Sequence, residues 1–550
     1  MRKNRDASAD AQTLADIEDA ANAQEVGRAV EMARAALADG LQHPMLYNLR
    51  SYWWTMQGRH DEALNDLRTA LTISPADLLV RNAYGMLLGK MERWPEALNI
   101  LRESAEMAPD FAVAQFSLGW ALERTGEIDE ARHYFEIAAG LDPAFVKPLV
   151  HLADFAQRRS DWATAKEMAN RALGLEPNHY VALTVLAIVA LAENDVAGAE
   201  ALVTPLMGRQ AETLLDASLA RRVLGDVRHA QGRYAQAFAA YKHSNRQKYE
   251  LYAARYETPG TTAADYCRWL SDYFAKCEPQ TWSARRANVP DDPRDGAREH
   301  VFLVGFPRSG TTLLENVLAS HPDVCTLEER DTFGPLTHSF LIDDAGRDQL
   351  AGLSDAELGP HRAIYWDRVR NRYGAEVQGK VFVDKYPLSS LKLPMVAKLF
   401  PKAKILFAVR DPRDVVLSCF RRNFAMNTSM FEFLEIERAA RFYDAVMNLC
   451  AVYHDRLDLD WHQIHNEALV EDFDGEARKL CEFMGLTWND QMNDFAEHAK
   501  SRTIRTPSSV QVVRGINRDG VGVWRNYQLE MAPALPVLRR WIETFGYQAE

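Results

Sequence analysis

The N-terminal half of the chain repeats one pattern of small, apolar and proline positions every 34 residues. Alanine occupies one column of this pattern, at Ala29, Ala63, Ala97, Ala131, Ala165 and Ala199. Proline occupies another column, at Pro75, Pro109, Pro143 and Pro177. A proline just past a helix ends that helix, and small side chains let two helices cross closely. The pattern therefore predicts a series of helix–turn–helix units.

This pattern resembles the tetratricopeptide repeat, which has the same period and the same placing of small residues and terminal proline. The register is good over about residues 44–205, and one last unit follows a short insertion. Because a single hairpin cannot bury its apolar face alone, the resemblance implies an all-α solenoid with a concave surface. Such a surface usually binds a peptide or protein. Repeats that only dimerise or support the other half are the alternative.

The periodicity stops near Asn245, and a different organisation follows. An apolar helix face comes next, made by Tyr266, Trp269, Leu270, Tyr273 and Phe274. We expect this helix to bridge the two halves, and the polar, turn-rich residues 289–296 to mark a domain boundary. The expected domains are a helical lead-in (1–43), the solenoid (44–250), a bridge helix with linker (251–297) and a second domain (298–550).

The second domain opens with a pattern that is typical of an anion-binding loop. A short apolar run at 300–304 precedes a glycine-containing loop, and an apolar-periodic stretch follows at 313–319. This order predicts a buried strand, a loop and a helix. The spacing from Gly305 to Gly310 is that of a phosphate-binding P-loop, in which backbone N–H groups at a helix N-terminus hold phosphate oxygens.

One position of this loop argues against a nucleoside triphosphatase. Thr311 stands where those enzymes need a lysine, so we do not expect a triphosphate used in the usual way. Arg308 supplies a positive charge instead, and its planar guanidinium matches an oxyanion well. Ser309 and Thr312 add hydroxyl donors to the same loop.

A second strand and its exit complete the pattern. Residues 404–409 form an apolar run, and Arg410 opens the turn Arg-Asp-Pro-Arg-Asp directly after it. Ser418 lies eight residues further on in the expected helix, with Arg422 one turn later on the same face. Ligands of open α/β sheets bind at the carboxyl ends of the strands, so both loops are expected to face one ligand.

These two segments resemble the 5′-phosphosulfate loop and the 3′-phosphate motif of sulfotransferases that use 3′-phosphoadenosine 5′-phosphosulfate. The resemblance covers about residues 298–550 and is closest to the tyrosylprotein-sulfotransferase-like branch, which includes bacterial proteins with tetratricopeptide repeats. It implies an α/β, P-loop-like domain with a parallel sheet. The residues that it assigns to the 5′-phosphosulfate are Arg308, Ser309, Gly310, Thr311 and Thr312. Those that it assigns to the 3′-phosphate are Arg410, Ser418 and Arg422.

The same resemblance implies the roles of the catalytic residues. Glu329 matches the base of the family, with Glu328 as the second choice, and Lys385 matches the lysine that donates to the bridging oxygen as the 5′-phosphate leaves. His321 competes as the base, because small-molecule sulfotransferases employ a histidine. Charge that stabilises the transferring group is assigned to Arg308.

Two later segments extend the resemblance. The run 506–515 looks like the loop that closes over the nucleotide, with Ser508 and Arg514 as cofactor or transition-state contacts. Asn466 begins a stretch in which relatives often have Tyr-Glu-Asp-Leu-Val, so an aromatic contact near the adenosine is missing here.

Composition excludes several other classes of protein. The net charge of −13 over 550 residues is the wrong balance for a protein that mainly grips nucleic acid. The most apolar run, 180–192, is shorter than the ~20 residues that cross a bilayer. The six cysteines have neither CxxC nor metal-type spacing, so we expect reduced thiols and no metal. We expect a cytoplasmic protein without membrane contact, and we leave a homo-oligomer open.

The resulting hypothesis is a sulfotransferase that moves a sulfuryl group to a hydroxyl acceptor. The acceptor could be protein tyrosine, a carbohydrate or a metabolite, and the repeats would recruit this acceptor or a partner. A repeat-based scaffold with an inactive nucleotide-binding domain is one alternative. A phosphotransferase is the other, and the missing lysine of the loop opposes it.

Overall fold

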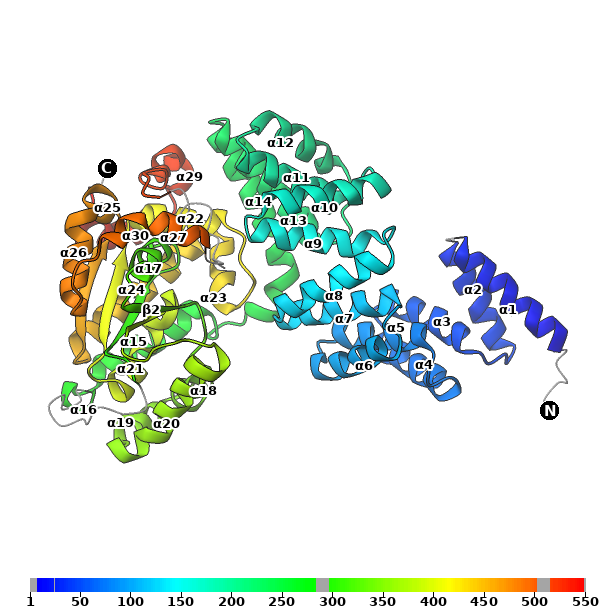
Figure 1. Ribbon diagram of the computed structural model, residues 1–550, viewed down its shortest axis with the longest axis horizontal. Helices are drawn as coiled ribbons and strands as arrows, with labels where there is room; N and C mark the ends of the chain where they lie inside the picture. The colour runs from blue at the N-terminus through cyan, green and yellow to red at the C-terminus, as the bar shows by residue number, and fades with distance from the viewer. Residues whose placement is uncertain (1–6, 24, 283–295, 502–514, 549–550) are drawn as a thin grey trace. The chain divides into compact units, whose positions relative to one another are not determined.

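The computed structural model describes residues 7–23, 25–282, 296–501 and 515–548. Contacts divide the chain into two compact units (Figure 1). The N-terminal unit comprises residues 1–157 and 162–185, and the C-terminal unit comprises 158–161 and 186–550. No helix in the described ranges is both long and apolar enough to cross a membrane.

The N-terminal unit consists of helices that pair in succession, as the 34-residue pattern predicts. The alanines of the repeated column are fully buried between them, from Ala29 to Ala165. Gly85 shows how close the helices come, because a Cβ there would lie 2.5 Å from the Leu101 side chain. The helices are α1 (Ala7–Asn22), α2 (Val26–Ala38), α3 (Pro44–Met56), α4 (His60–Ile73), α5 (Leu78–Lys90), α6 (Trp94–Met107), α7 (Ala112–Thr125), α8 (Ile128–Leu141), α9 (Val146–Arg158), α10 (Trp162–Leu175) and α11 (Tyr180–Ala192), of which the last runs into the next unit.

The C-terminal unit begins with helices that continue this style of packing. They are α12 (Val196–Val203), α13 (Leu214–Ala230), α14 (Tyr234–Tyr256), α15 (Ala263–Lys276) and α16 (Pro279–Trp282). Helix α15 confirms the helix that the sequence predicts around Tyr266, and its Leu270 and Phe274 are fully buried in the core of this unit. The predicted boundary at 289–296 lies almost wholly outside the described residues. The domain limits 1–43, 44–250, 251–297 and 298–550 therefore stay predictions.

Five parallel strands form the sheet of this unit, which confirms the predicted α/β domain. The strands are β1 (Glu299–Gly305), β2 (Val324–Glu328), β3 (Val381–Lys385), β4 (Lys404–Val409) and β5 (Asp460–His465), in the order β2-β3-β1-β4-β5. Strand β1 lies in the middle, beside both β3 and β4, and Gly305 is paired with Ala408. The exits of β1 and β4 therefore lie at the same edge of the sheet.

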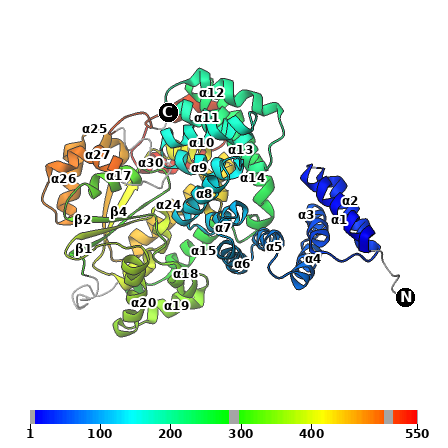
Figure 2. The same cartoon turned by 45° about the vertical axis from the view of Figure 1, so that its right-hand side comes forward.

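Helices cover both faces of the sheet (Figure 2). Successive side chains of β1 point to opposite faces, so Val301 and Leu303 enter one core while Phe302 and Val304 enter the other. Both faces are buried, as is usual for parallel sheets. The helices after β1 are α17 (Thr311–Ala319), α18 (Gly334–Phe340), α19 (Asp344–Gly352), α20 (Asp355–Asp367), α21 (Leu393–Leu399), α22 (Pro412–Arg421), α23 (Thr428–Phe431), α24 (Ile436–Arg456), α25 (Asn466–Glu471), α26 (Phe473–Met484), α27 (Phe495–Ser501), α29 (Gln528–Met531) and α30 (Leu535–Thr544).

Helix α14 packs directly against α22, the helix that follows β4. The rings of Phe238 and Phe420 stack with centroids 4.9 Å apart, and the Asn245 side chain donates to the Phe420 carbonyl at 2.9 Å. Both Asn245 and Phe420 are buried. The last helical hairpin and the α/β sheet thus share one core.

Strand β3 carries a buried carboxyl in the middle of that core. Asp384 is fully buried and accepts hydrogen bonds from the Thr332 hydroxyl and the Tyr365 hydroxyl, each at 2.8 Å. Burial disfavours the charged form and raises the pKa of this carboxyl to about 6. Asp384 therefore holds its proton in the folded protein at pH values where an unfolded chain has lost it.

The packing of α14 on α22 predicts a local effect of Phe238→Ala. Removing a buried aromatic ring destabilises a core by about 3 to 5 kcal/mol. Hydrogen exchange measured by mass spectrometry should therefore become faster in residues 412–421. Phe135→Ala is the matched control, because Phe135 is fully buried among aromatic rings of the N-terminal unit. Equal protection of 412–421 in the wild type and Phe238→Ala would contradict this packing.

The raised pKa of Asp384 predicts how stability depends on pH. The folded state binds the proton more tightly than the unfolded state, so this group favours folding at low pH. Its contribution falls as the pH rises from about 4 to about 6 and is constant above that. Relative to Asp384→Asn, the wild type should lose up to about 3 kcal/mol of unfolding free energy between pH 4 and 7. Urea unfolding at both pH values tests this, and a constant difference would contradict it.

Candidate active site

The loop after β1 adopts a compact turn that only certain residues can form. Gly305 has a φ of +157° and Gly310 has a φ of +99°. A Cβ on Gly305 would lie 2.6 Å from the Ala408 carbonyl oxygen of the neighbouring strand, so a side chain does not fit there. Arg308 also lies in the left-handed region, with a φ of +72°. This is unusual for a residue with a long side chain and indicates local strain that the surrounding contacts hold in place.

The two segments that the sequence singles out meet at the edge of the sheet. One Arg410 guanidinium nitrogen donates to the Arg308 carbonyl at 3.2 Å, and the other donates to the Gly520 carbonyl. The Nε of Arg308 donates to the Ser418 hydroxyl at 3.1 Å. The structure thus brings Arg308, Arg410 and Ser418 together, as the sequence predicts.

The charges of these residues suit an anion. Burial and the nearby charges of Arg422 and Arg410 lower the pKa of Arg308 to about 9. Two donors also lack a hydrogen-bond partner among the described residues, namely the buried Ser309 hydroxyl and the Nε of Arg410. A bound anion would relieve the repulsion between the arginines and could accept from such donors.

Arg422 is the capping residue at the C-terminal end of the helix that carries Ser418, and its place on the same face as Ser418 stays a prediction. Helix α22 ends at Arg421, and Arg422 has an extended backbone with φ −91° and ψ 154°. Its N–H closes the last turn on the Cys419 carbonyl, after which the chain leaves the helix. Burial lowers the pKa of the Arg422 guanidinium, so this side chain is also held away from water.

A buried lysine and three glutamates lie at the exits of β2 and β3. The Lys385 Nζ is 3.0 Å from Glu329 Oε1, 3.1 Å from Glu315 Oε2 and 3.8 Å from Glu328 Oε1. Burial by itself lowers the pKa of Lys385, but the carboxylates of Glu315, Glu329 and Glu328 outweigh it and raise this pKa above its usual value. The backbone extends the pairing of the two strands, because the Glu329 N–H donates to the Lys385 carbonyl at 2.7 Å.

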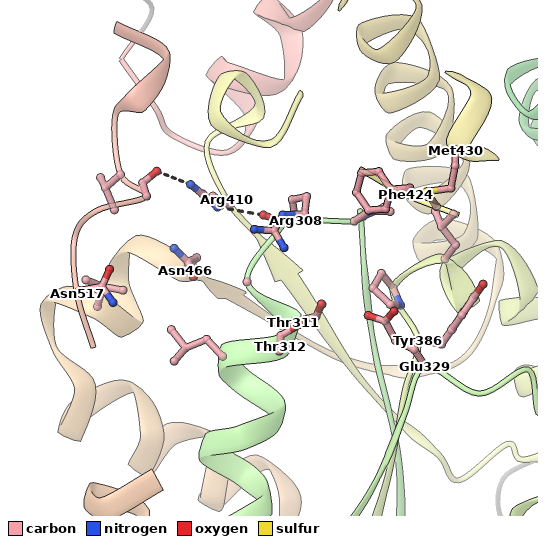
Figure 3. Close-up of a pocket in the computed structure, with 18 of the residues that line it drawn as sticks. Arg308, Thr311, Thr312, Glu329, Tyr386, Arg410, Phe424, Met430, Asn466 and Asn517 are labelled. Atoms are coloured by element: carbon pink, nitrogen blue, oxygen red, sulfur yellow. Dashed lines mark hydrogen bonds between the residues drawn. The ribbon is translucent and has the colours of Figure 1, made fainter. Parts of the chain in front are cut away.

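One pocket lies between the loop after β1, Arg410 and Glu329 (Figure 3). Polar side chains line one side and the middle of it, from Asn517, Asn466, Arg410, Arg308, Thr311 and Thr312. The opposite side is formed by the Glu329 carboxylate with larger, mainly apolar side chains, from Tyr386, Phe424 and Met430. The polar side of the pocket can therefore bind an anionic ligand. The opposite side can bind an apolar group of the size of a ring, next to the Glu329 carboxylate.

The other base candidates are placed differently. The His321 ring is nearly buried at the end of α17, where Nε2 lies 2.8 Å from the Thr487 carbonyl oxygen and Nδ1 accepts from the Asp323 N–H. Both ring nitrogens thus have backbone partners in a turn. Glu328 contacts Lys385 only at the longer distance and does not line the pocket.

The chain after residue 514 returns to the pocket. Ser508 and Arg514 lie outside the described residues, but Gly515, Asn517 and Gly520 line the pocket. The Asp414 carboxylate fixes this return, because it accepts from the Gly522 N–H at 2.6 Å and from the Trp524 N–H at 2.9 Å.

Sequence reasoning missed several pocket residues. Tyr386, Phe424, Met430 and Asn517 carry no spacing pattern that ties them to the two loops. The sequence could have indicated Glu315, because this residue lies one helical turn after Thr311 and faces the end of the same strand. Among the residues that the structure describes, no group of three or more His, Cys, Asp or Glu side chains is placed to hold a metal ion.

Comparisons with known proteins give matches to parts of this chain. An uncharacterized protein of Aquifex aeolicus is 25% identical over 253 residues, which are 44% of this chain and 32% of that protein. Protein-tyrosine sulfotransferase 1 of Danio rerio is 26% identical over 257 residues, which are 44% of this chain and 71% of that protein. The structure of Pseudomonas aeruginosa pilF aligns over 36% of this chain and 91% of its own, with 17% identity and a TM-score of 0.32.

Two family models match separate parts of the chain. Residues 83–144 match the tetratricopeptide repeat, and residues 300–490 match the sulfotransferase family. Both resemblances inferred from the sequence are thereby confirmed. The chain therefore has a helical N-terminal part that matches the tetratricopeptide repeat and a C-terminal α/β domain whose residues 300–490 match the sulfotransferase family.

Proposed function

We propose that this protein transfers a sulfuryl group from 3′-phosphoadenosine 5′-phosphosulfate to a hydroxyl acceptor. One observation carries the proposal: a single pocket is lined by the loop after β1, by Arg410 and by the Glu329 carboxylate. The match of residues 300–490 to the sulfotransferase family supports the type of reaction. The alternative function, a scaffold with an inactive nucleotide-binding domain, is not supported by the site. Arg308 contacts Ser418 and Lys385 contacts Glu329, so the groups that the reaction needs are held together.

The donor would bind with its phosphosulfate on the loop and its 3′-phosphate near Arg410. Backbone N–H groups at the start of α17 and the hydroxyls of Ser309, Thr311 and Thr312 would hold the 5′ end. Arg410 and Ser418 would hold the 3′-phosphate, with Arg422 close behind them. Ser508 and Arg514 stay predictions for the same ligand. The orphaned donors on Ser309 and Arg410 support this arrangement.

The transfer itself requires a base and a positive charge. The acceptor oxygen forms a bond to sulfur, the bond from sulfur to the phosphate oxygen breaks with its electron pair on that oxygen, and the hydroxyl proton goes to Glu329. Lys385 and Arg308 would stabilise the charge that develops on the leaving oxygen and the transferring group. Glu329 and Lys385 lie in contact at the exits of adjacent strands, which supports this pairing of roles.

A phenol such as protein tyrosine is the acceptor that we favour. Tyr386, Phe424 and Met430 line the pocket on the Glu329 side, and an aromatic ring packs well against such groups. The name of the Danio rerio relative supports the same class. We further propose that the repeats recruit a polypeptide acceptor or a partner, since stacked repeats form extended binding surfaces. A cytoplasmic location and a homo-oligomer stay predictions from the sequence.

The proposed contacts of Arg410 with the 3′-phosphate predict which nucleotide binds more tightly. Adenosine 3′,5′-bisphosphate should bind more tightly than AMP, and Arg410→Ala should remove most of the difference. A hydrogen bond to a charged group is worth roughly 1.5 to 3 kcal/mol, or about tenfold to a hundredfold in affinity. Calorimetry with both ligands measures this, with Arg441→Ala as the control because Arg441 is half exposed on α24. Equal affinities in the wild type, or tighter binding of ATP, would refute the proposed function.

The proposed role of Glu329 as the base predicts the effect of removing its carboxylate. Glu329→Gln keeps the shape of the side chain but cannot accept the proton, so kcat should fall by about 10² or more. Affinity for adenosine 3′,5′-bisphosphate should stay nearly the same, which shows that the variant is folded. Steady-state kinetics on Glu328→Gln and His321→Ala provide the comparison. A fully active Glu329→Gln beside an inactive Glu328→Gln or His321→Ala would mean that the base is misassigned.

A further inference from the structure

The Lys385 ammonium is shared by two carboxylates, of which only one has a role so far. Lys385 has no exposed side-chain surface, and the Glu315 side chain is 1% exposed. Glu329, the second partner, is 35% exposed and lines the pocket. The lysine therefore contacts one carboxylate in the interior and another at the wall of the pocket, at nearly equal distances of 3.1 Å and 3.0 Å.

This contact creates a conflict for the proposed base. A carboxylate that is paired with an ammonium is stabilised in its charged form and is a weaker proton acceptor. In the proposed reaction Lys385 must therefore leave Glu329, which takes the acceptor's proton, and reach the leaving phosphate oxygen. A buried ammonium that loses its partner is strongly unfavourable, so such a movement requires a second carboxylate.

Glu315 has the position and the support to be that second carboxylate. It lies in the middle of α17, one turn after Thr311. Its Oε1 accepts from the Thr326 hydroxyl of β2 at 3.1 Å, while its Oε2 faces Lys385. One oxygen is thus fixed by a neighbouring strand and the other is directed at the lysine, which holds the carboxylate in one orientation.

We propose that Glu315 is a positioning residue that keeps Lys385 charged and in place while the lysine exchanges Glu329 for the leaving phosphate oxygen. The inference rests on the proposed function, because it uses the roles of Glu329 and Lys385 in sulfuryl transfer. Glu315 itself does not touch the substrate; it acts through Lys385.

The charged and titratable groups around this pair determine the expected pH dependence. Lys385 faces Glu315 from α17 and Glu328 and Glu329 from the end of β2. Glu329 also acts on Arg308 of the loop and on Tyr386 next to Lys385. Glu315→Gln removes one negative charge from this group. The lysine should then lose its proton at lower pH, because one of the three carboxylates that raise its pKa is neutral.

Glu315→Gln should therefore lower kcat by about tenfold to a hundredfold, the range for losing a hydrogen bond to a charged group. The basic limb of the pH profile of kcat should move to lower pH, because Lys385 loses one of the carboxylates that raise its pKa. KM for the donor and the affinity for adenosine 3′,5′-bisphosphate should change little. Glu437→Gln is the control, because Glu437 forms only an exposed pair with Arg441 and should leave kcat and both limbs unchanged.

A second measurement does not depend on activity. Lys385→Met leaves the buried Glu315 carboxylate without its cation, so the double variant Lys385→Met/Glu315→Gln should melt at a higher temperature than Lys385→Met alone. Thr326→Val keeps the charge of Glu315 but loosens its orientation. It should lower kcat less than Glu315→Gln does and leave the basic limb in place.

The outcomes separate this inference from the proposed function. If the wild-type protein neither binds adenosine 3′,5′-bisphosphate nor turns over the donor, the proposed function is contradicted. The proposed exchange of partners by Lys385 is then contradicted as well. An active wild type beside a Glu315→Gln variant with unchanged kcat and unchanged limbs overturns the role of Glu315 alone. A Glu315→Gln variant that is only less stable, with the wild-type pH profile, also overturns it.

Discussion

The close contact between β1 and β4 at Gly305 is the constraint from which the site follows. Gly305 pairs with Ala408, and the absence of a Cβ lets the backbone turn sharply against that strand. The turn brings Arg308 back over the exit of β4, where Arg410 holds its carbonyl. With any other residue at Gly305 the two strands would have to separate. The loop, the helix α17 and the guanidinium cluster would then no longer meet at one edge of the sheet.

The sequence predicts those parts of the fold that depend on local pattern. Alanine and proline columns identify the repeats because each unit obeys the same packing rule. The strands at 300–304 and 404–409 are visible because buried parallel strands are continuously apolar. Arg308, Arg410 and Ser418 were predicted to lie together, since loops at the carboxyl ends of neighbouring strands converge.

Features that depend on tertiary packing were not predictable in this way. Helix α22 ends at Arg421, and no local pattern indicates where the chain turns away from this helix. The contacts of Lys385 with both Glu315 and Glu329 join β3 to α17 and to the end of β2. Phe424 and Met430 reach the pocket only through the path that the chain takes after α22. No spacing rule describes such a path.

Helix α22 connects three different parts of the C-terminal unit. It carries Ser418 on the side of Arg308, fixes the return of the chain through Asp414, and packs against α14 through Phe420. The helical hairpin of α13 and α14 therefore belongs to the scaffold of the pocket, although it has the architecture of a repeat. An exchange of repeat arrays between such proteins should accordingly place the junction before α13. A junction after α14 would leave the buried face of Phe420 open to water.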